Sequence, residues 1–65
     1  MTISEAAKII LRESGRPMKP KELVRDIEAR GLFKFNAKQP ESVLASTLRQ
    51  KADIFEKTKD GFKLK

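Results

Sequence analysis

A chain of 65 residues that contains no cysteine and no histidine must be held together by its apolar side chains alone. Domains of this size bury only about 60% of the surface that the unfolded chain exposes, so many small folds add disulfides or zinc. Both supports are excluded here. We therefore expect one domain over residues 1–65, a whole protein or a piece of a longer one, with no metal or other cofactor. The missing cysteine fits a reducing intracellular compartment, in the cytoplasm or nucleoid, or in the nucleus of a eukaryote.

The first helix is delimited by signals at both ends. Thr2 and Glu5 have the spacing of a capping box, which marks a helix start. Gly15 ends a helix readily, and Pro17 prevents its continuation. The stripe that this helix is expected to bury consists of Ile3, Ala6, Ala7, Ile10 and Leu11.

The second helix begins at Pro20, a residue suited to the first helical position, and ends at Gly31. Its expected buried residues are Leu23, Val24 and Ile27. Two side-chain pairs are predicted, namely a hydrophobic staple between Met18 and Leu23 and a helical ion pair between Asp26 and Arg30. Leu32 to Asn36 then forms a packed loop, in which Phe33 or Phe35 is the aromatic residue expected to stay partly exposed.

A third helix is predicted from about Pro40 to Ala52, with Gln39 as a poor cap. Helical periodicity assigns its two sides. The expected buried side is Val43, Leu44, Thr47 and Leu48, and the expected exposed side is Ser42, Ala45, Ser46 and Arg49. The exposed side is therefore a strip of three small residues followed by an arginine.

The last 12 residues change to a β-pattern, with two short stretches on either side of Asp60-Gly61, a dipeptide favoured in tight hairpins. Three helices followed by a hairpin is the order of a winged helix-turn-helix, a mainly α fold of the α+β type. The residues expected to be buried together are Leu23, Ile27, Leu44, Leu48, Phe55, Phe62 and Leu64.

The charge of the chain favours a polyanion as its partner. The sequence carries 15 Lys and Arg against 9 Asp and Glu, a net charge of +6 at pH 7. The alternative is that the charge only keeps a small domain soluble, since a net charge of roughly 2–8 is ordinary for such domains. The excess is larger in the second half of the chain, where the third helix and the hairpin lie.

Two surfaces are candidates for contact with double-stranded DNA. The small residues of the third helix would let its backbone approach the floor of a major groove, and Arg49 would reach a phosphate or a guanine edge. Lysines of the hairpin would lie along phosphates, although lysines also protect edge strands from aggregation. The predicted DNA-binding residues are Lys38, Gln39, Ser42, Ser46, Arg49, Lys57, Lys59 and Lys63.

Enzymatic chemistry is not expected of this chain. Its three glycines are isolated, so no phosphate-cradling loop is present, and no serine stands in a nucleophile-elbow context. The acidic residues of the second helix have basic neighbours that explain them as ion-pair partners. No catalytic residue, small-molecule substrate or membrane partner is therefore predicted.

The chain resembles the HARE helix-turn-helix family, which is shared by Asx-like chromatin proteins, homeobox-linked plant proteins and restriction-associated proteins, with a relative in the bacterial RNA polymerase delta subunit. The matching residues, mostly scaffold positions, are Glu5-Ala6-Ala7, Ile10-Leu11, Gly15-Arg16-Pro17-Met18, Glu22-Leu23, Ile27, Arg30-Gly31-Leu32, Lys38-Gln39-Pro40-Glu41, Leu44, Ala45, Leu48, Ile54-Phe55, Gly61-Phe62 and Leu64.

The resemblance implies a winged helix in which residues near Pro17-Met18 form a third short strand beside the hairpin. It also implies DNA binding in a transcription, chromatin or restriction context. The chain departs from the family pattern at Gln39, where a threonine cap is common, and in its short wing, which argues against deep insertion into a groove. Some family members work through protein contacts, so the alternative function is an adaptor that binds a polymerase, chromatin or restriction protein.

Overall fold

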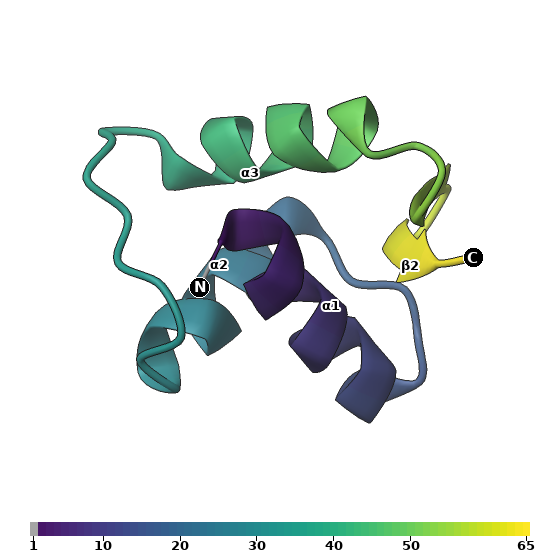
Figure 1. Cartoon of the computed structure of the whole chain (residues 1–65), viewed down its shortest axis with the longest axis horizontal. Helices are drawn as coiled ribbons and strands as arrows, with labels where there is room; N and C mark the ends of the chain where they lie inside the picture. Colours follow the sequence, from purple (N-terminus) through teal and green to yellow (C-terminus); the bar gives the residue numbers. More distant parts are fainter. Residues whose placement is uncertain (1) are drawn as a thin grey trace.

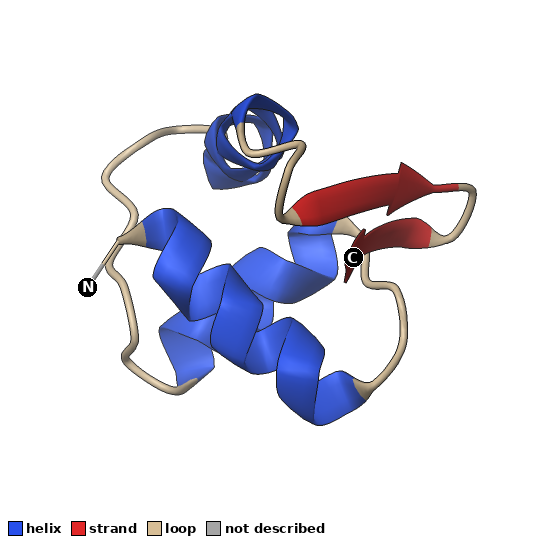
Figure 2. Cartoon of the chain, turned by 45° about the vertical axis from the view of Figure 1, so that its right-hand side comes forward, coloured by secondary structure: helices blue, strands red, loops and turns tan. Residues whose placement is uncertain are grey.

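The computed structural model describes residues 2–65 and contains three helices followed by a two-stranded antiparallel hairpin. The elements are α1 (Ile3–Ser14), α2 (Pro20–Ala29), α3 (Pro40–Gln50), β1 (Phe55–Thr58) and β2 (Gly61–Leu64). In Figure 1, α3 lies across one side of α1 and α2, and the hairpin stands beside the C-terminal end of α3. Figure 2 shows the same arrangement with helices in blue and strands in red. The predicted winged helix-turn-helix architecture is confirmed.

A single apolar core lies between the three helices and the hairpin. The largest side chains in it that are almost wholly buried are Ile10, Leu23, Ile27, Leu44 and Leu48. Phe55 and Phe62 close the core from the hairpin, and Leu64 packs against it while staying partly exposed. The predicted core is thus confirmed, with Leu64 at its margin.

The start of α1 forms the predicted capping box. The Glu5 backbone N–H donates to the Thr2 hydroxyl at 3.2 Å, and the Thr2 backbone N–H donates to Glu5 Oε1 at 3.0 Å. Two backbone donors that the helix cannot satisfy internally are satisfied in this way. At the other end, the Gly15 N–H donates to the Leu11 carbonyl, as expected for the predicted helix stop.

We expect this capping box to respond to acid. The hydrogen bond from the Thr2 backbone N–H, and then that involving the Thr2 hydroxyl, lower the pKa of Glu5. A carboxylate whose pKa is lowered on folding stabilises the fold above its ordinary pKa, and this contribution is lost as the pH falls through the lowered value. An NMR titration of the Glu5 carboxyl should therefore give a midpoint below that of the unfolded chain. In Thr2→Pro, which lacks both donors, a midpoint that stays equally low would contradict the assignment.

The second helix begins as predicted at Pro20, with a different cap from that of α1. Glu22 Oε1 accepts the Lys19 backbone N–H at 3.0 Å, which is half of a capping box, because a lysine side chain has no acceptor for the reciprocal bond. Both members of the predicted staple, Met18 and Leu23, are buried in the core.

The ion pair predicted within α2 is wrong. Arg30 is the cap residue that follows the last turn, and its Nη1 lies 2.6 Å from Glu13 Oε1 of α1. Among residues 2–65, no ion pair joins Asp26 to Arg30. Arg30 is therefore a link between two helices, because the packing of α1 against α2 brings the ends of both together. Both side chains are about half exposed, so the pair contributes little stability.

The third helix differs from its prediction in two ways. It ends at Gln50, and residues 51–54 form a turn that leads into the hairpin. Val43 was expected to be buried but is 39% exposed, whereas Ala45, expected on the exposed side, is half-buried and packs against the core. The buried stripe of α3 is narrow, with Leu44 and Leu48 at its centre, and it is rotated toward the hairpin side.

The hairpin forms as predicted, but its turn is displaced by one residue. Thr58 pairs with Gly61, so the loop consists of Lys59 and Asp60, and neither of them has a positive φ. The Thr58 hydroxyl organises this loop, since it donates to the Gly61 carbonyl at 2.7 Å and accepts the Asp60 N–H at 3.3 Å. The positive φ that the dipeptide supplies is confined to Gly61.

A third, one-residue strand lies along the free edge of β2, as the family resemblance implied. Met18 and Phe62 exchange both backbone hydrogen bonds, at 2.9 and 2.8 Å. These bonds attach the hairpin to the segment that leads into α2. The wing and the start of α2 therefore have a fixed relative position.

The loop between α2 and α3 contains an aromatic pair. The rings of Phe33 and Phe35 meet edge to face with centroids 5.1 Å apart. Phe35 is buried and Phe33 is half-buried, so Phe33 is the partly exposed aromatic residue that the sequence predicted. Across residues 2–65, no helix is long and apolar enough to cross a membrane.

Candidate nucleic-acid interface

The outer face of α3 is the predicted strip of small residues. Ser42 and Ser46 are exposed, and Ala45 lies half-buried beside them. Neither the serines nor the alanine projects far from the helix, so a ligand would approach the backbone of α3 closely here. Arg49 follows on the same face, is exposed, and its Nε lies 3.4 Å from the Ala45 carbonyl oxygen. The structure thus brings Ser42, Ser46 and Arg49 together.

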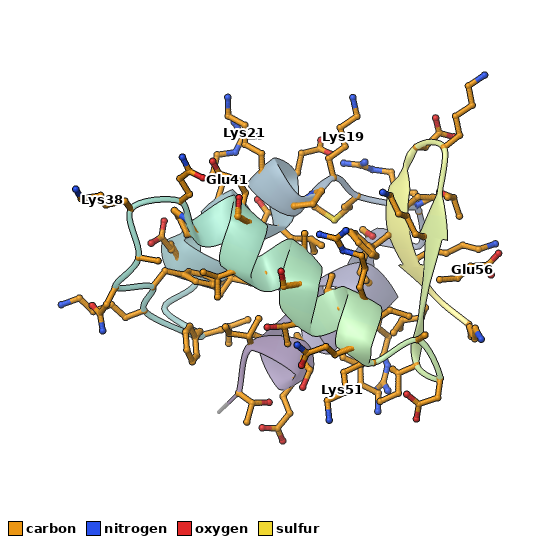
Figure 3. The ribbon with its side chains drawn as sticks, turned by 90° about the horizontal axis from the view of Figure 1, so that it is seen from above. Lys19, Lys21, Lys38, Glu41, Lys51 and Glu56 are labelled. Atoms are coloured by element: carbon orange, nitrogen blue, oxygen red, sulfur yellow. The ribbon has the colours of Figure 1, made fainter. Side chains whose placement is uncertain are left out.

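The start of α2 borders this strip, which the sequence reading did not anticipate. Lys19 and Lys21 line a shallow hollow together with the small residues and Arg49 of α3. In Figure 3, which looks down onto α3, both lysines stand along one side of that helix. The signal was present in the sequence, because in helix-turn-helix folds the first helix of the motif crosses the DNA backbone beside the recognition helix.

The wing lysines divide between two faces of the hairpin. Lys57 is paired with Phe62 in the strand register, so both lie on the face that turns toward the helices, and Lys63 is paired with Glu56 on the opposite face. Lys57 and Lys59 line a hollow that Arg49 also lines. Lys63 lies beside Arg16 in a separate hollow, and its Nζ is 3.9 Å from Glu56 Oε1.

Lys38 and Gln39 lie at the opposite end of α3 from the wing. Both are exposed, and Gln39 makes no side-chain hydrogen bond to the helix start, although it accepts the Ser42 hydroxyl at 3.4 Å. Glu41 stands in the first turn, and Figure 3 shows it between the labelled lysines 38 and 21. The surface near the start of α3 therefore has mixed charge.

The positive charge is least balanced near the C-terminal end of α3. Within residues 2–65, ion pairs join Arg30 to Glu13 and Lys63 to Glu56, and none involves Lys19, Arg49, Lys57 or Lys59. The same part of the chain holds no cluster of acidic residues that would bind a metal ion. This surface is suited to binding an extended anion by charge and hydrogen bonding.

Comparison with known proteins gives one result. The profile of HARE-HTH, the restriction endonuclease and ASXL helix-turn-helix domain, matches residues 1–63. Searches among curated proteins and among solved structures found no significant match. HARE-HTH is a DNA-binding domain family that is not known as enzymatic. The chain therefore belongs to the HARE-HTH family, and this membership suggests a DNA-binding helix-turn-helix module.

Proposed function

We propose that this domain binds double-stranded DNA with the outer face of α3 toward the major groove and with wing lysines on the phosphates. The observation that carries the proposal is the strip formed by Ser42, Ala45 and Ser46, which is bordered on two sides by unpaired cations from other elements. A helix enters a groove only where its side chains leave room, and the phosphates on either side of the groove require positive charge.

The binding surface that we propose differs from the sequence prediction in its flanks. Lys19 and Lys21 are added at the start of α2, because they border the same hollow as the α3 strip. Lys57 and Lys59 stay, whereas Lys63 faces away and is paired with Glu56. Lys38 and Gln39 are placed to touch the backbone at the far end of α3. DNA as the partner implies an intracellular protein of transcription, chromatin or restriction, without an enzymatic activity of its own.

The wing is too short to insert deeply into a groove. Its loop is only Lys59 and Asp60, and one of these residues is acidic. A lysine at this tip would neutralise a phosphate, and the neighbouring carboxylate opposes closer approach. We therefore assign the wing to the DNA backbone, and any readout of base edges to α3.

An NMR titration with a labelled-free short duplex at low salt tests the proposal directly. The amide signals of residues 19–21, 42–49 and 57–60 should shift, and the binding constant should fall as salt rises, with a slope of about −0.9 per neutralised phosphate. If duplex DNA leaves these signals in place while a polymerase, chromatin or restriction protein shifts them, the domain is an adaptor and the DNA proposal is wrong.

A pair of charge-matched variants locates the groove-facing surface. Ser46→Glu places a larger, negative side chain in the strip of α3 and should weaken duplex binding by roughly tenfold or more, because the carboxylate both fills space and repels phosphates. Ala52→Glu changes the net charge equally at an exposed residue beyond the end of α3. Fluorescence anisotropy should show a much smaller loss for Ala52→Glu. Equal losses would mean that only net charge matters.

A further inference from the structure

Arg49 lies where three elements of the fold meet. The end of α3, the wing and the segment that begins α2 enclose a hollow of about 260 Å³. Four of the residues that line this notch are exposed cations, namely Lys19, Arg49, Lys57 and Lys59. Its apolar walls include Pro20, Ala45 and Phe62.

The notch contains no acidic residue, unlike the hollow that continues along α3. Glu41 lines that neighbouring hollow, together with Lys19, Lys21 and Arg49. Asp60 belongs to the wing tip but does not line the notch. Cations that converge on a small, partly apolar space without a carboxylate repel one another, and a single anion bound between them relieves this repulsion.

The backbone fixes the relative position of the three elements that supply the cations. Met18, next to Lys19, is hydrogen-bonded in both directions to Phe62 of β2, whose register partner on β1 is Lys57. Ala45, one turn before Arg49, packs against the core and lines the notch. The notch is thus formed before any ligand binds, which lowers the ordering cost of binding.

We propose that this notch binds one phosphate of the DNA backbone, and that Arg49 is a ligand of this phosphate and does not read a base. The inference rests on the proposed function and goes beyond it, because a guanidinium held on a phosphate leaves α3 only Ser42, Ser46 and Gln39 for contacts to base edges. The domain should then bind many duplex sequences with similar affinity. Lys19, which the sequence analysis did not single out, acts in the same phosphate contact.

The test compares Arg49→Ala, Arg49→Lys and Lys57→Ala, with the double variant of Arg49→Ala and Lys57→Ala. Binding constants are measured by anisotropy against short duplexes in which each base pair is varied in turn, over a range of salt concentrations. Lys51→Ala is the matched control, because it also removes one exposed positive charge from α3. Lys51 caps the end of that helix and lies on the side of α3 away from Lys19 (Figure 3).

A phosphate ligand and a base reader give different results. On a phosphate, Arg49→Ala weakens every duplex by the same factor, roughly tenfold at low salt, Arg49→Lys keeps most of the affinity, and Lys51→Ala leaves it nearly unchanged. Because Arg49 and Lys57 share one phosphate, the double variant lowers the salt slope by no more than about 0.9.

Three outcomes overturn the inference, and one of them also overturns the proposed function. If Arg49→Ala removes a preference at one base pair, Arg49 reads a base. If the double variant lowers the salt slope by about 1.8, the two cations contact separate phosphates. In both cases the wild-type domain still binds DNA, so the proposed function stands. If the wild-type domain binds no duplex at low salt, both proposals are wrong.

Discussion

Gly61→Ala should destabilise the domain by about 3 kcal/mol or more, although it adds only one methyl group. Gly61 has a φ of +131°, which an alanine rarely adopts. A Cβ at this position would also lie 2.7 Å from the Lys19 nitrogen and still closer to the Met18 carbonyl carbon and oxygen. These are backbone atoms, so the clash is relieved only if the wing moves away from the segment before α2. The hydrogen bonds between Met18 and Phe62 would then break.

Gly31→Ala is the matched control for this prediction. Gly31 also has a positive φ, of +66°, but a Cβ there would meet no atom within 4 Å. It should therefore cost only the backbone strain, about 1 kcal/mol. Since 1 kcal/mol corresponds to roughly 4–8 °C in a domain of this size, thermal unfolding should separate the two variants clearly. Equal melting temperatures would show that the close approach of Gly61 to Met18 does not limit stability.

Leu44→Ala should cost about 2–5 kcal/mol, the usual range for a fully buried leucine. Leu44 is 0% exposed and belongs to the narrow stripe by which α3 packs on the core. A domain of 65 residues has a total stability of only about 3–10 kcal/mol, so this variant should be largely unfolded at moderate temperature. Chemical denaturation followed by circular dichroism measures the loss.

Its neighbour provides the control. Val43 is 39% exposed, and Val43→Ala should change the stability by no more than about 1 kcal/mol. The comparison also tests the orientation of α3 about its axis. If Val43→Ala proved as damaging as Leu44→Ala, the helix would be rotated toward the orientation that the sequence pattern predicted, and the strip of Ser42, Ala45 and Ser46 would face a different direction.

The orientation of α3 shows why the candidate site was only partly predictable. Helical periodicity placed Ser42, Ser46 and Arg49 on one exposed side, and this is confirmed. Periodicity did not distinguish Val43 from Ala45 at the edges of the buried stripe. Their burial depends on which side of α3 the hairpin covers, and that is a property of the packing of distant segments.

The wing shows the same division. An Asp-Gly dipeptide between two β-stretches was enough to predict a hairpin, because few residues adopt the backbone that such turns need. It was not enough to place the turn, which the Thr58 hydroxyl bonds shift onto Lys59 and Asp60. A shift of register by one residue exchanges the two faces of a strand, so the face on which each lysine lies needed the three-dimensional pairing.

The sequence by itself determined the number, order and approximate limits of the elements, since caps, prolines, glycines and apolar periodicity are local signals. It also determined the positive charge that makes an anionic partner plausible. Only the tertiary structure decided that Lys19 of the segment before α2, Arg49 of α3 and Lys57 of β1 line one notch, while Lys63 lies on the other face. The reason is physical: these cations are brought together by the Met18–Phe62 bridge and by the packing of α3, contacts between residues far apart in the chain that no local pattern encodes.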